Sequence, residues 1–189
     1  MKLIISEKSI AGQRIASILA GKNLAATLEG FAQLFEFSKN NEQYILIPLK
    51  GHIVNVDFPK QYAYWMGTDL KKLADVEIEY VGQEKQIISL MEKKASLFDE
   101  VIIATDSDRE GESIGLEALN YVTAKNPKIK IKRANFSAIT NQDINEAFSS
   151  LGELNYDFAE SANARREIDL IWGACLTRFV SIVSGRLGA

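Results

Sequence analysis

The sequence lacks the residues that usually hold small domains together covalently or through a metal. Cysteine and histidine occur once each, as Cys175 and His52. A single cysteine excludes an internal disulfide bond, and the two residues together cannot supply the four ligands of a structural zinc site. We therefore expect a chain that folds around its hydrophobic core in a reducing, cytoplasmic environment.

Long apolar runs are also missing. The N-terminus, MKLIISEKSI, has three consecutive apolar residues before Ser6, which is too few for a signal peptide or a membrane span. No membrane association is therefore expected. With 189 residues, of which 47% are hydrophobic, the chain is long enough to bury a core and to form one or two domains.

The sequence has no basic excess of the kind that often marks a nucleic-acid-binding domain, since its net charge is -3. The charges are instead segregated along the chain. Residues 99–117 contain seven acidic residues and one basic residue, Arg109, whereas residues 118–142 contain five basic residues and no acidic one. Taken alone, such runs are typical of two solvated surface faces.

Apolar residues alternate between strand and helix patterns up to Arg133. The expected order is strand 2–6, helix 10–19, helix 84–97, strand 100–105, helix 111–122 and strand 129–132. Strands that alternate with helices predict a parallel α/β sheet covered by helices.

Two segments interrupt this alternation. Residues 32–38 and 42–49 flank Lys39-Asn40-Asn41, and asparagine tolerates the positive φ of a tight turn, so we expect an inserted β-hairpin. The aromatic-rich stretch punctuated by Gly51, Pro59 and Gly67 has weak periodicity and is expected to be a structured loop.

The pattern changes after Arg133. The segment Thr140-Asn-Gln-Asp143 predicts the N-terminal cap of a short helix, and residues 157–183 follow one long helical pattern with no strand after it. We divide the chain into an α/β domain at 1–133 and a helical segment at 134–189. The long helix has an apolar face for which this chain supplies little cover, so we expect the chain to be a fragment.

An acidic motif, TDSDREGES, follows the strand at 100–105. If the backbone stays extended, the carboxylates of Asp106 and Asp108 point to one side, roughly 7 Å apart. Glu110 adds a third carboxylate at the edge where open α/β sheets bind ligands. The motif therefore predicts a Mg²⁺ site, although acidic residues also cap helix N-termini favourably.

Two other known motifs share part of this pattern. Asp106, Asp108, Glu110, Gly111 and Glu117 fall on positions of a calcium EF-hand loop, but that loop requires a preceding helix where VIIAT is a strand sequence. An aspartyl phosphatase motif requires Thr or Val at the fourth position after its first Asp, where this sequence has Glu110.

Glu7 follows the first strand as Asp106 follows a later one. Adjacent parallel strands end at the same edge of a sheet, so Glu7 is expected to approach the acidic motif. Lys8 beside it is suited to offset the charge of a phosphate oxygen. The alternative is that Glu7 is an ordinary acidic residue in the first turn of a helix.

A strand ending in Glu followed by a later strand ending in Asp-x-Asp-x-Glu-Gly resembles the TOPRIM domain of topoisomerases, primases and nucleases. Further segments resemble the N-terminal region of type IA DNA topoisomerases, particularly archaeal ones, in the same order along the chain. These segments are LIISEKSIAGQRIASIL, GHIVNVDFP, VIIATDSDREGESIGLEAL, RANFSAIT and NARREIDLIWGACLTRFVS. The resemblance implies a Rossmann-like TOPRIM domain at 1–133 and the start of a further topoisomerase domain at 134–189.

The resemblance also implies roles for individual residues. Asp106 and Asp108 would bind Mg²⁺, with Glu110 supporting the metal cluster. Glu7 would be the general acid and base at the scissile phosphate, and Lys8 would stabilise the charge that develops there. The residues implied to contact DNA are Arg133, Arg165, Arg166, Arg178 and His52, with Asp169 orienting one of the arginines. A surface salt bridge is the alternative for each arginine, and a loop histidine bonded to backbone is the alternative for His52.

The sequence departs from the family in having Ser9 and Ile10 where Pro-Ser commonly follows Glu-Lys. The family's nucleophilic tyrosine lies in a distant domain and matches no tyrosine here. The resemblance therefore implies an ATP-independent, monomeric enzyme that acts at the nucleoid on a single-stranded segment of negatively supercoiled DNA, with other domains of the same polypeptide supplying the tyrosine. The alternatives are a Mg²⁺-dependent TOPRIM nuclease, a non-catalytic DNA-binding module, and the corresponding region of reverse gyrase.

Overall fold

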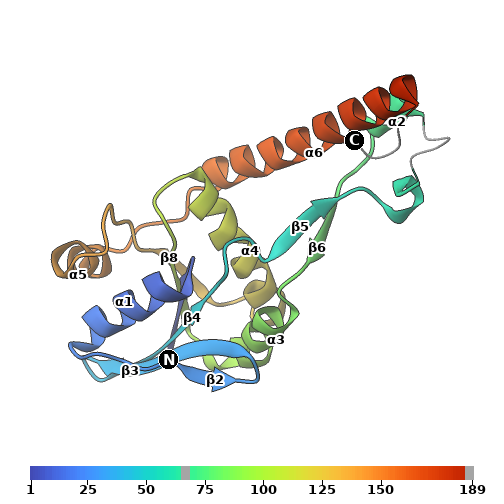
Figure 1. Ribbon diagram of the computed structural model, residues 1–189. Helices are drawn as coiled ribbons and strands as arrows, with labels where there is room; N and C mark the ends of the chain where they lie inside the picture. Colours follow the sequence, from blue (N-terminus) through green and yellow to red (C-terminus); the bar gives the residue numbers. More distant parts are fainter. Residues whose placement is uncertain (65–68, 186–189) are drawn as a thin grey trace.

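The computed structural model describes residues 1–64 and 69–185 and has a six-stranded mixed sheet at its centre (Figure 1). The strand order is β2-β3-β4-β1-β7-β8. Four neighbouring strands are parallel, and they are β4 (Glu42–Pro48), β1 (Lys2–Ser6), β7 (Glu100–Ala104) and β8 (Lys130–Arg133). The expected α/β fold with a largely parallel sheet flanked by helices is confirmed.

The predicted hairpin is present, but it is part of the central sheet. β3 (Ala32–Lys39) pairs antiparallel with β4, and β2 (Thr27–Glu29) extends the antiparallel edge. β4 also pairs in parallel with β1, which makes it a central strand. Asn40 and Asn41 form the two-residue turn with φ of 53° and 64°, as their tolerance of positive φ predicts.

This turn gives a first testable prediction. Replacing Asn41 with valine is expected to lower the free energy of unfolding by about 1 to 2 kcal/mol, because a β-branched residue is strained at positive φ. Replacing Asn41 with glycine, the matched control, is expected to leave stability unchanged or raise it. Urea unfolding followed by circular dichroism measures both variants. Equal stability of the valine and glycine variants would contradict the proposed turn geometry.

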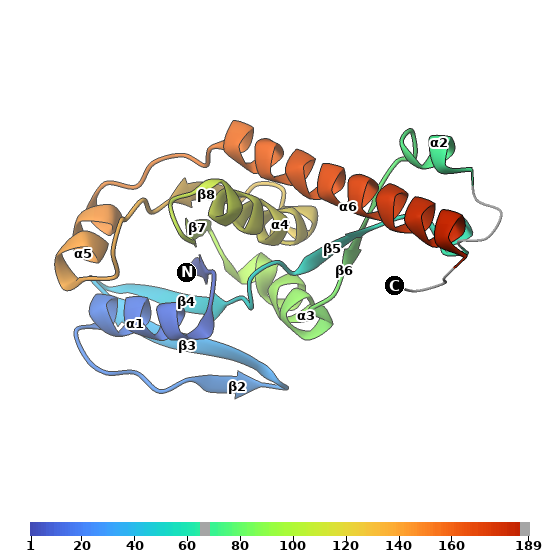
Figure 2. The same cartoon turned by 45° about the horizontal axis from the view of Figure 1, so that its top comes forward.

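Helices cover both faces of the sheet because side chains alternate along each strand. Leu3 and Ile5 of β1 face one core, beneath α3 (Lys85–Lys94) and α4 (Arg109–Lys125). Ile4 faces the opposite core, beneath α1 (Ser9–Ala20) and α5 (Asn141–Ser149). Figure 2 shows α1 and α4 on opposite sides of the sheet. The parallel strands are thus buried on both faces, which matches their continuous apolar sequences.

The segment after β4 contains more regular structure than predicted. β5 (Val54–Asp57) and β6 (Glu79–Gly82) pair antiparallel, with a short helical turn (Lys60–Tyr62) and α2 (Leu70–Leu73) between them. The prediction of a structured loop is therefore wrong at β5. Its partner β6 lies too far away in the sequence for a local pattern to reveal the pairing. Gly67, part of that prediction, lies outside the described residues.

The long helix α6 (Tyr156–Ser184) begins beside α4 and extends away from the sheet next to β5 and β6 (Figure 1). Its N-terminus is capped by Asn155, whose side chain accepts a hydrogen bond from the backbone N–H of Phe158. Several large apolar side chains on α6 are exposed, namely Ile168, Trp172, Leu176, Phe179, Val180, Ile182 and Val183. None of the described helices is long and apolar enough to cross a membrane.

Candidate functional site

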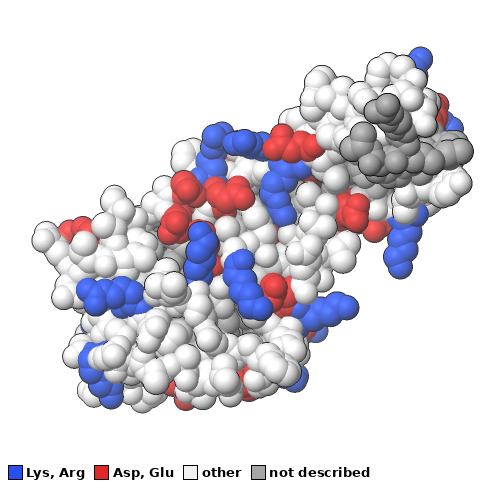
Figure 3. All heavy atoms as spheres, viewed as in Figure 1, with Lys and Arg blue, Asp and Glu red and all other residues white. Residues whose placement is uncertain are grey.

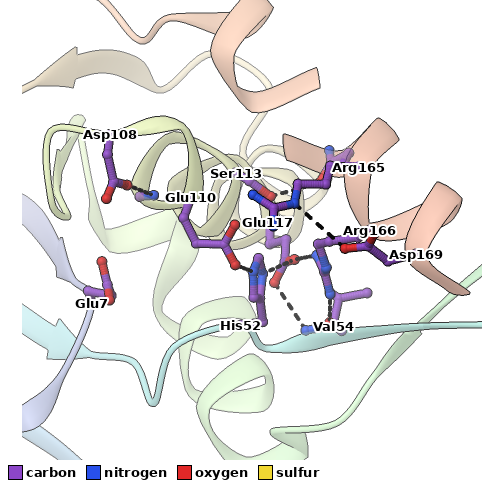
Figure 4. Close-up of polar contacts among 12 residues, drawn as sticks. Glu7, His52, Val54, Asp108, Glu110, Ser113, Glu117, Arg165, Arg166 and Asp169 are labelled. Carbon is purple, nitrogen blue, oxygen red and sulfur yellow. Dashed lines mark hydrogen bonds and ion pairs between the residues drawn. The ribbon is translucent and has the colours of Figure 1, made fainter. Parts of the chain in front are cut away.

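Four charged side chains gather where β1 and β7 end, at the carboxyl edge of the parallel part of the sheet. Glu7 and Lys8 follow β1, and Asp106 and Asp108 follow β7. Lys8 Nζ lies 3.1 Å from Glu7 Oε1, with Lys8 exposed and Glu7 buried. Figure 4 shows Glu7 and Asp108 facing the same space. The structure therefore brings together two predicted catalytic residues and two of the three predicted metal ligands.

The loop that carries the aspartates is fixed by hydrogen bonds at several points. Thr105 Oγ1 donates to the carbonyl oxygen of Gly111 at 2.7 Å, and Ser107 Oγ donates to that of Phe136 at 3.0 Å. Asp108 is the N-cap of α4, and its Oδ1 accepts from the backbone N–H of Gly111 at 2.7 Å. A carboxylate at this position also interacts favourably with the helix dipole. Asp108 thus stabilises the start of α4, whether or not it also binds a metal ion.

The cluster has more negative than positive charge. Burial raises the pKa of Asp106, the neighbouring charge of Glu7 raises it further, and Lys8 lowers it. In return, the hydrogen bond to Glu7 and the nearby aspartates raise the pKa of Lys8. Like charges held close together disfavour the ionised form of a carboxyl group, and a bound cation would relieve this repulsion.

The donor set fits Mg²⁺, since carboxylate oxygens are the ligands that this ion prefers. However, within residues 1–64 and 69–185 no group of three or more His, Cys, Asp or Glu side chains converges in a geometry for holding a metal ion. Glu110, the third predicted ligand, is turned toward His52.

His52 lies between two carboxylates of α4. Its Nε2 is 2.5 Å from Glu110 Oε1, and its Nδ1 is 2.7 Å from Glu117 Oε1 (Figure 4). Burial alone would lower the pKa of His52, but the hydrogen bonds to Glu117 and Glu110 outweigh it and raise this pKa above its ordinary value. These contacts differ from the backbone hydrogen bond expected as the alternative for His52, and its contact with DNA stays a prediction.

Arg133 forms the most deeply buried ion pair near the site. Its Nε donates to Glu112 Oε1 at 2.7 Å, and both side chains are buried. Its terminal nitrogens donate to four backbone carbonyl oxygens, those of Ile103, Thr105, Asp106 and Ala134. The prediction that Arg133 contacts DNA is therefore corrected, because its guanidinium group supports the acidic loop from inside the protein.

Two arginines of α6 also point into the protein, whereas a third is exposed. Arg178 is buried, donates to the carbonyl oxygen of Tyr62 at 2.9 Å, and lies over the ring of Phe58. Arg166 points inward to Glu117. Neither is placed to contact DNA in this conformation. Arg165 is 74% exposed, and its Nε lies 3.6 Å from Asp169 Oδ2, a contact that fits both the expected orienting role of Asp169 and the alternative of a surface salt bridge.

A hollow of about 220 Å³ lies between the start of α4 and α6, next to the acidic loop. It is lined by Asp108, Arg109, Glu110, Ser161, Ala162 and Arg165. In Figure 3, acidic side chains gather near the point where the start of α6 crosses α4, and Lys and Arg side chains border them. The hollow thus places carboxylates and two arginines together.

Sequence reasoning missed three residues of this region. Glu117 was considered only as part of an EF-hand pattern, yet it lies two helical turns after Glu110 on the same face of α4, and that spacing is a signal. Glu112 and Arg109 were not singled out, although both lie within the acidic motif. The pairing of Glu112 with Arg133 joins residues 21 positions apart, and no local pattern reveals it.

Comparisons with known proteins point to one family. Residues 2–139 match the family model described as Toprim domain. The chain is 44% identical to DNA topoisomerase 1 of Archaeoglobus fulgidus, over 98% of this chain and 28% of that protein. It is 43% identical to DNA topoisomerase 1 of Thermoplasma acidophilum, over 99% and 24% respectively. DNA topoisomerase 3-alpha of Arabidopsis thaliana is 32% identical over 96% of this chain and 20% of that protein.

The chain thus spans 28% or less of the length of these three relatives. Among solved structures, the native futalosine hydrolase of Helicobacter pylori aligns over 89% of this chain and 97% of its own chain. At 10% identity and a TM-score of 0.30, this likeness is too low to indicate a shared fold.

Proposed function

The chain belongs to the Toprim domain family, and from this premise we propose that it is the Mg²⁺-binding part of a type IA DNA topoisomerase. Such an enzyme relaxes negatively supercoiled DNA by transient cleavage and religation of one strand, without ATP. The observation that carries the proposal is the meeting of Glu7, Lys8, Asp106 and Asp108 at one edge of the sheet, where open α/β sheets bind ligands.

Asp106 and Asp108 would hold the Mg²⁺ ion, which when bound supplies positive charge beside the phosphate. Glu110 would support the ion from the first turn of α4. The hollow beside the acidic loop offers Arg109 and Arg165 as further positive charges for a DNA backbone. Few other basic residues border it, so we expect DNA affinity of the chain alone to be weak and steeply dependent on salt.

Glu7 is suited to move the proton of the reaction. As the tyrosine oxygen, having lost its proton to solvent, bonds to phosphorus, the bond between phosphorus and the 3′ oxygen breaks, and Glu7 would give its proton to that leaving oxygen. During religation Glu7 would take a proton back from the 3′ hydroxyl, and the released tyrosine oxygen would regain its proton from solvent. Lys8 Nζ, 3.1 Å from Glu7 Oε1, would stabilise the negative charge that develops on the phosphate.

The nucleophile is proposed to come from another domain of the same polypeptide. Burial and the hydrogen bond to Glu167 raise the pKa of Tyr80 to about 12, so its phenol ionises less readily than that of a free tyrosine. Burial also raises the pKa of Tyr44 and of Tyr121. We further propose that the segment 134–189, which contains α5 and α6, begins a further topoisomerase domain.

Incubation with negatively supercoiled plasmid and Mg²⁺ tests the proposal. The 189-residue chain alone is expected to leave the plasmid unchanged, as a topoisomerase part without its tyrosine should. Nicking that disappears in Asp106→Ala would instead identify a nuclease, and a ladder of relaxed topoisomers would place the nucleophile in this chain. Absence of any Mg²⁺ response in calorimetry would favour a non-catalytic module.

The same polypeptide extended by its remaining domains provides the positive test. It is expected to relax the plasmid, and Glu7→Gln is expected to slow relaxation by about a hundredfold or more, because a general acid typically contributes that much. The matched control is Glu36→Gln, which changes an exposed carboxylate on β3. Equal rates for the two variants would remove Glu7 from the proposed mechanism.

A further inference from the structure

Glu117 is a buried carboxylate whose two oxygens are both fully used. Its Oε2 accepts hydrogen bonds from the backbone N–H groups of Ile53 and Val54, at 2.9 Å and 3.1 Å. Its Oε1 lies 2.7 Å from His52 Nδ1 and 2.5 Å from Arg166 Nη1. The side chain is 6% exposed. None of these contacts has a part in the proposed proton transfer, yet together they fix the position of the loop after Gly51.

The contact with Glu117 determines where the other ring nitrogen of His52 points. With Nδ1 bound to Glu117, the imidazole presents Nε2 to Glu110 Oε1 at 2.5 Å. A carboxylate that binds one nitrogen of a histidine fixes the orientation of the ring and hence the target of the other nitrogen. His52 is therefore held with its Nε2 directed at Glu110.

Glu110 has two possible partners in this arrangement. It lies in the first turn of α4, 55% exposed, beside the hollow that Asp108 also lines. Its carboxylate here binds an imidazole nitrogen, and the same lone pairs are the ones that a hard cation takes. An oxygen atom that shares a short hydrogen bond with His52 is less available to a cation.

We propose that Glu117 is a positioning residue that aims His52 at Glu110, so that His52 and a divalent cation compete for the Glu110 carboxylate. This inference rests on the proposed function, in which Glu110 belongs to the cation site.

If His52 and Mg²⁺ compete for Glu110, replacing His52 should strengthen Mg²⁺ binding, whereas damage to the fold should weaken it. Removal of the imidazole in His52→Ala should make Mg²⁺ bind about tenfold more tightly, since hydrogen bonds to charged groups are worth about that factor. Glu117→Gln should tighten binding in the same direction, because the imidazole is no longer aimed. A residue that only stabilises the fold would weaken binding when it is replaced.

Calorimetric titration of the chain with MgCl₂ at one fixed pH measures these affinities, with Glu36→Gln as the control that should match the wild type. Because His52 is the only histidine, ¹⁵N spectra of its ring report its hydrogen bonds without assignment. The wild-type ring signals should move on addition of Mg²⁺, and in Glu117→Gln they should differ from wild type before any Mg²⁺ is added.

The outcomes separate this inference from the proposed function. Mg²⁺ binding to the wild type with unchanged or weaker affinity in both His52→Ala and Glu117→Gln would overturn the competition while leaving the cation site in place. If neither the wild type nor the variants bind Mg²⁺, both proposals fail. The His52 variant keeps the test decisive even if Glu117→Gln folds poorly, which thermal unfolding will reveal.

Discussion

Replacing Arg133 with methionine is expected to lower the free energy of unfolding by about 3 to 5 kcal/mol, because Glu112 would remain as a buried charge without its partner. The pair is held at 2.7 Å with both side chains buried, and Glu112 Oε2 also accepts from the backbone N–H of Asn155. The substitution further leaves the carbonyl oxygens that border the acidic loop without their donor.

Urea unfolding measures the loss, and Arg165→Met is the matched control. Arg165 is exposed and pairs with Asp169 on the same helix, so its replacement should change stability by no more than about 0.5 kcal/mol. Adding Glu112→Gln to Arg133→Met should restore part of the loss, since the double variant has no unpaired buried charge. Arg133→Met with wild-type stability would contradict a structural role for this arginine.

Replacing Gly111 with alanine is expected to lower the free energy of unfolding by about 1 to 3 kcal/mol and to weaken any Mg²⁺ response. A Cβ atom at this position would lie 2.1 Å from the carbonyl oxygen of Asp106, so either the acidic loop or the start of α4 must move. Such a movement would also break the cap, in which the backbone N–H of Gly111 donates to Asp108.

The control for this substitution is Gly173→Ala. Gly173 lies within α6 with no neighbouring atom near the position of an added Cβ, so alanine there should stabilise the helix by about 0.5 to 1 kcal/mol. Thermal unfolding and Mg²⁺ titration of both variants provide the measurement. A Gly111→Ala chain as stable as the wild type would mean that the acidic loop can move to accommodate the added Cβ atom without a cost in stability.

Local sequence patterns predicted most of the fold. The apolar strand at the N-terminus, the strand before the acidic motif and the capped helix after Thr140 all appear where expected, because hydrophobic period and capping residues act over a few neighbouring positions. The pairing of β5 with β6 was missed, since it joins four-residue strands that are separated by 21 residues and gain their stability from each other.

The sequence identified residues of the candidate site, but it predicted the directions of their side chains only in part. Strand ends that meet at one edge were enough to place Glu7 near Asp106. The direction of each arginine depends on which buried carboxylate it meets, and Glu112 and Glu117 reach Arg133 and Arg166 through the tertiary structure alone. The sequence motif alone therefore did not show whether the side chain of a charged residue faces DNA or the protein interior.

The place of β1 in the sheet also determines when the sheet can form. β1 precedes both of its partners in the sequence, with Lys2 opposite Tyr44 on one side and Glu100 on the other. Parallel pairing over such separations requires the closure of long loops before any contact is gained. During translation, β1 must therefore remain without one neighbour until β7 has left the ribosome, and its apolar residues are only partly covered during that interval.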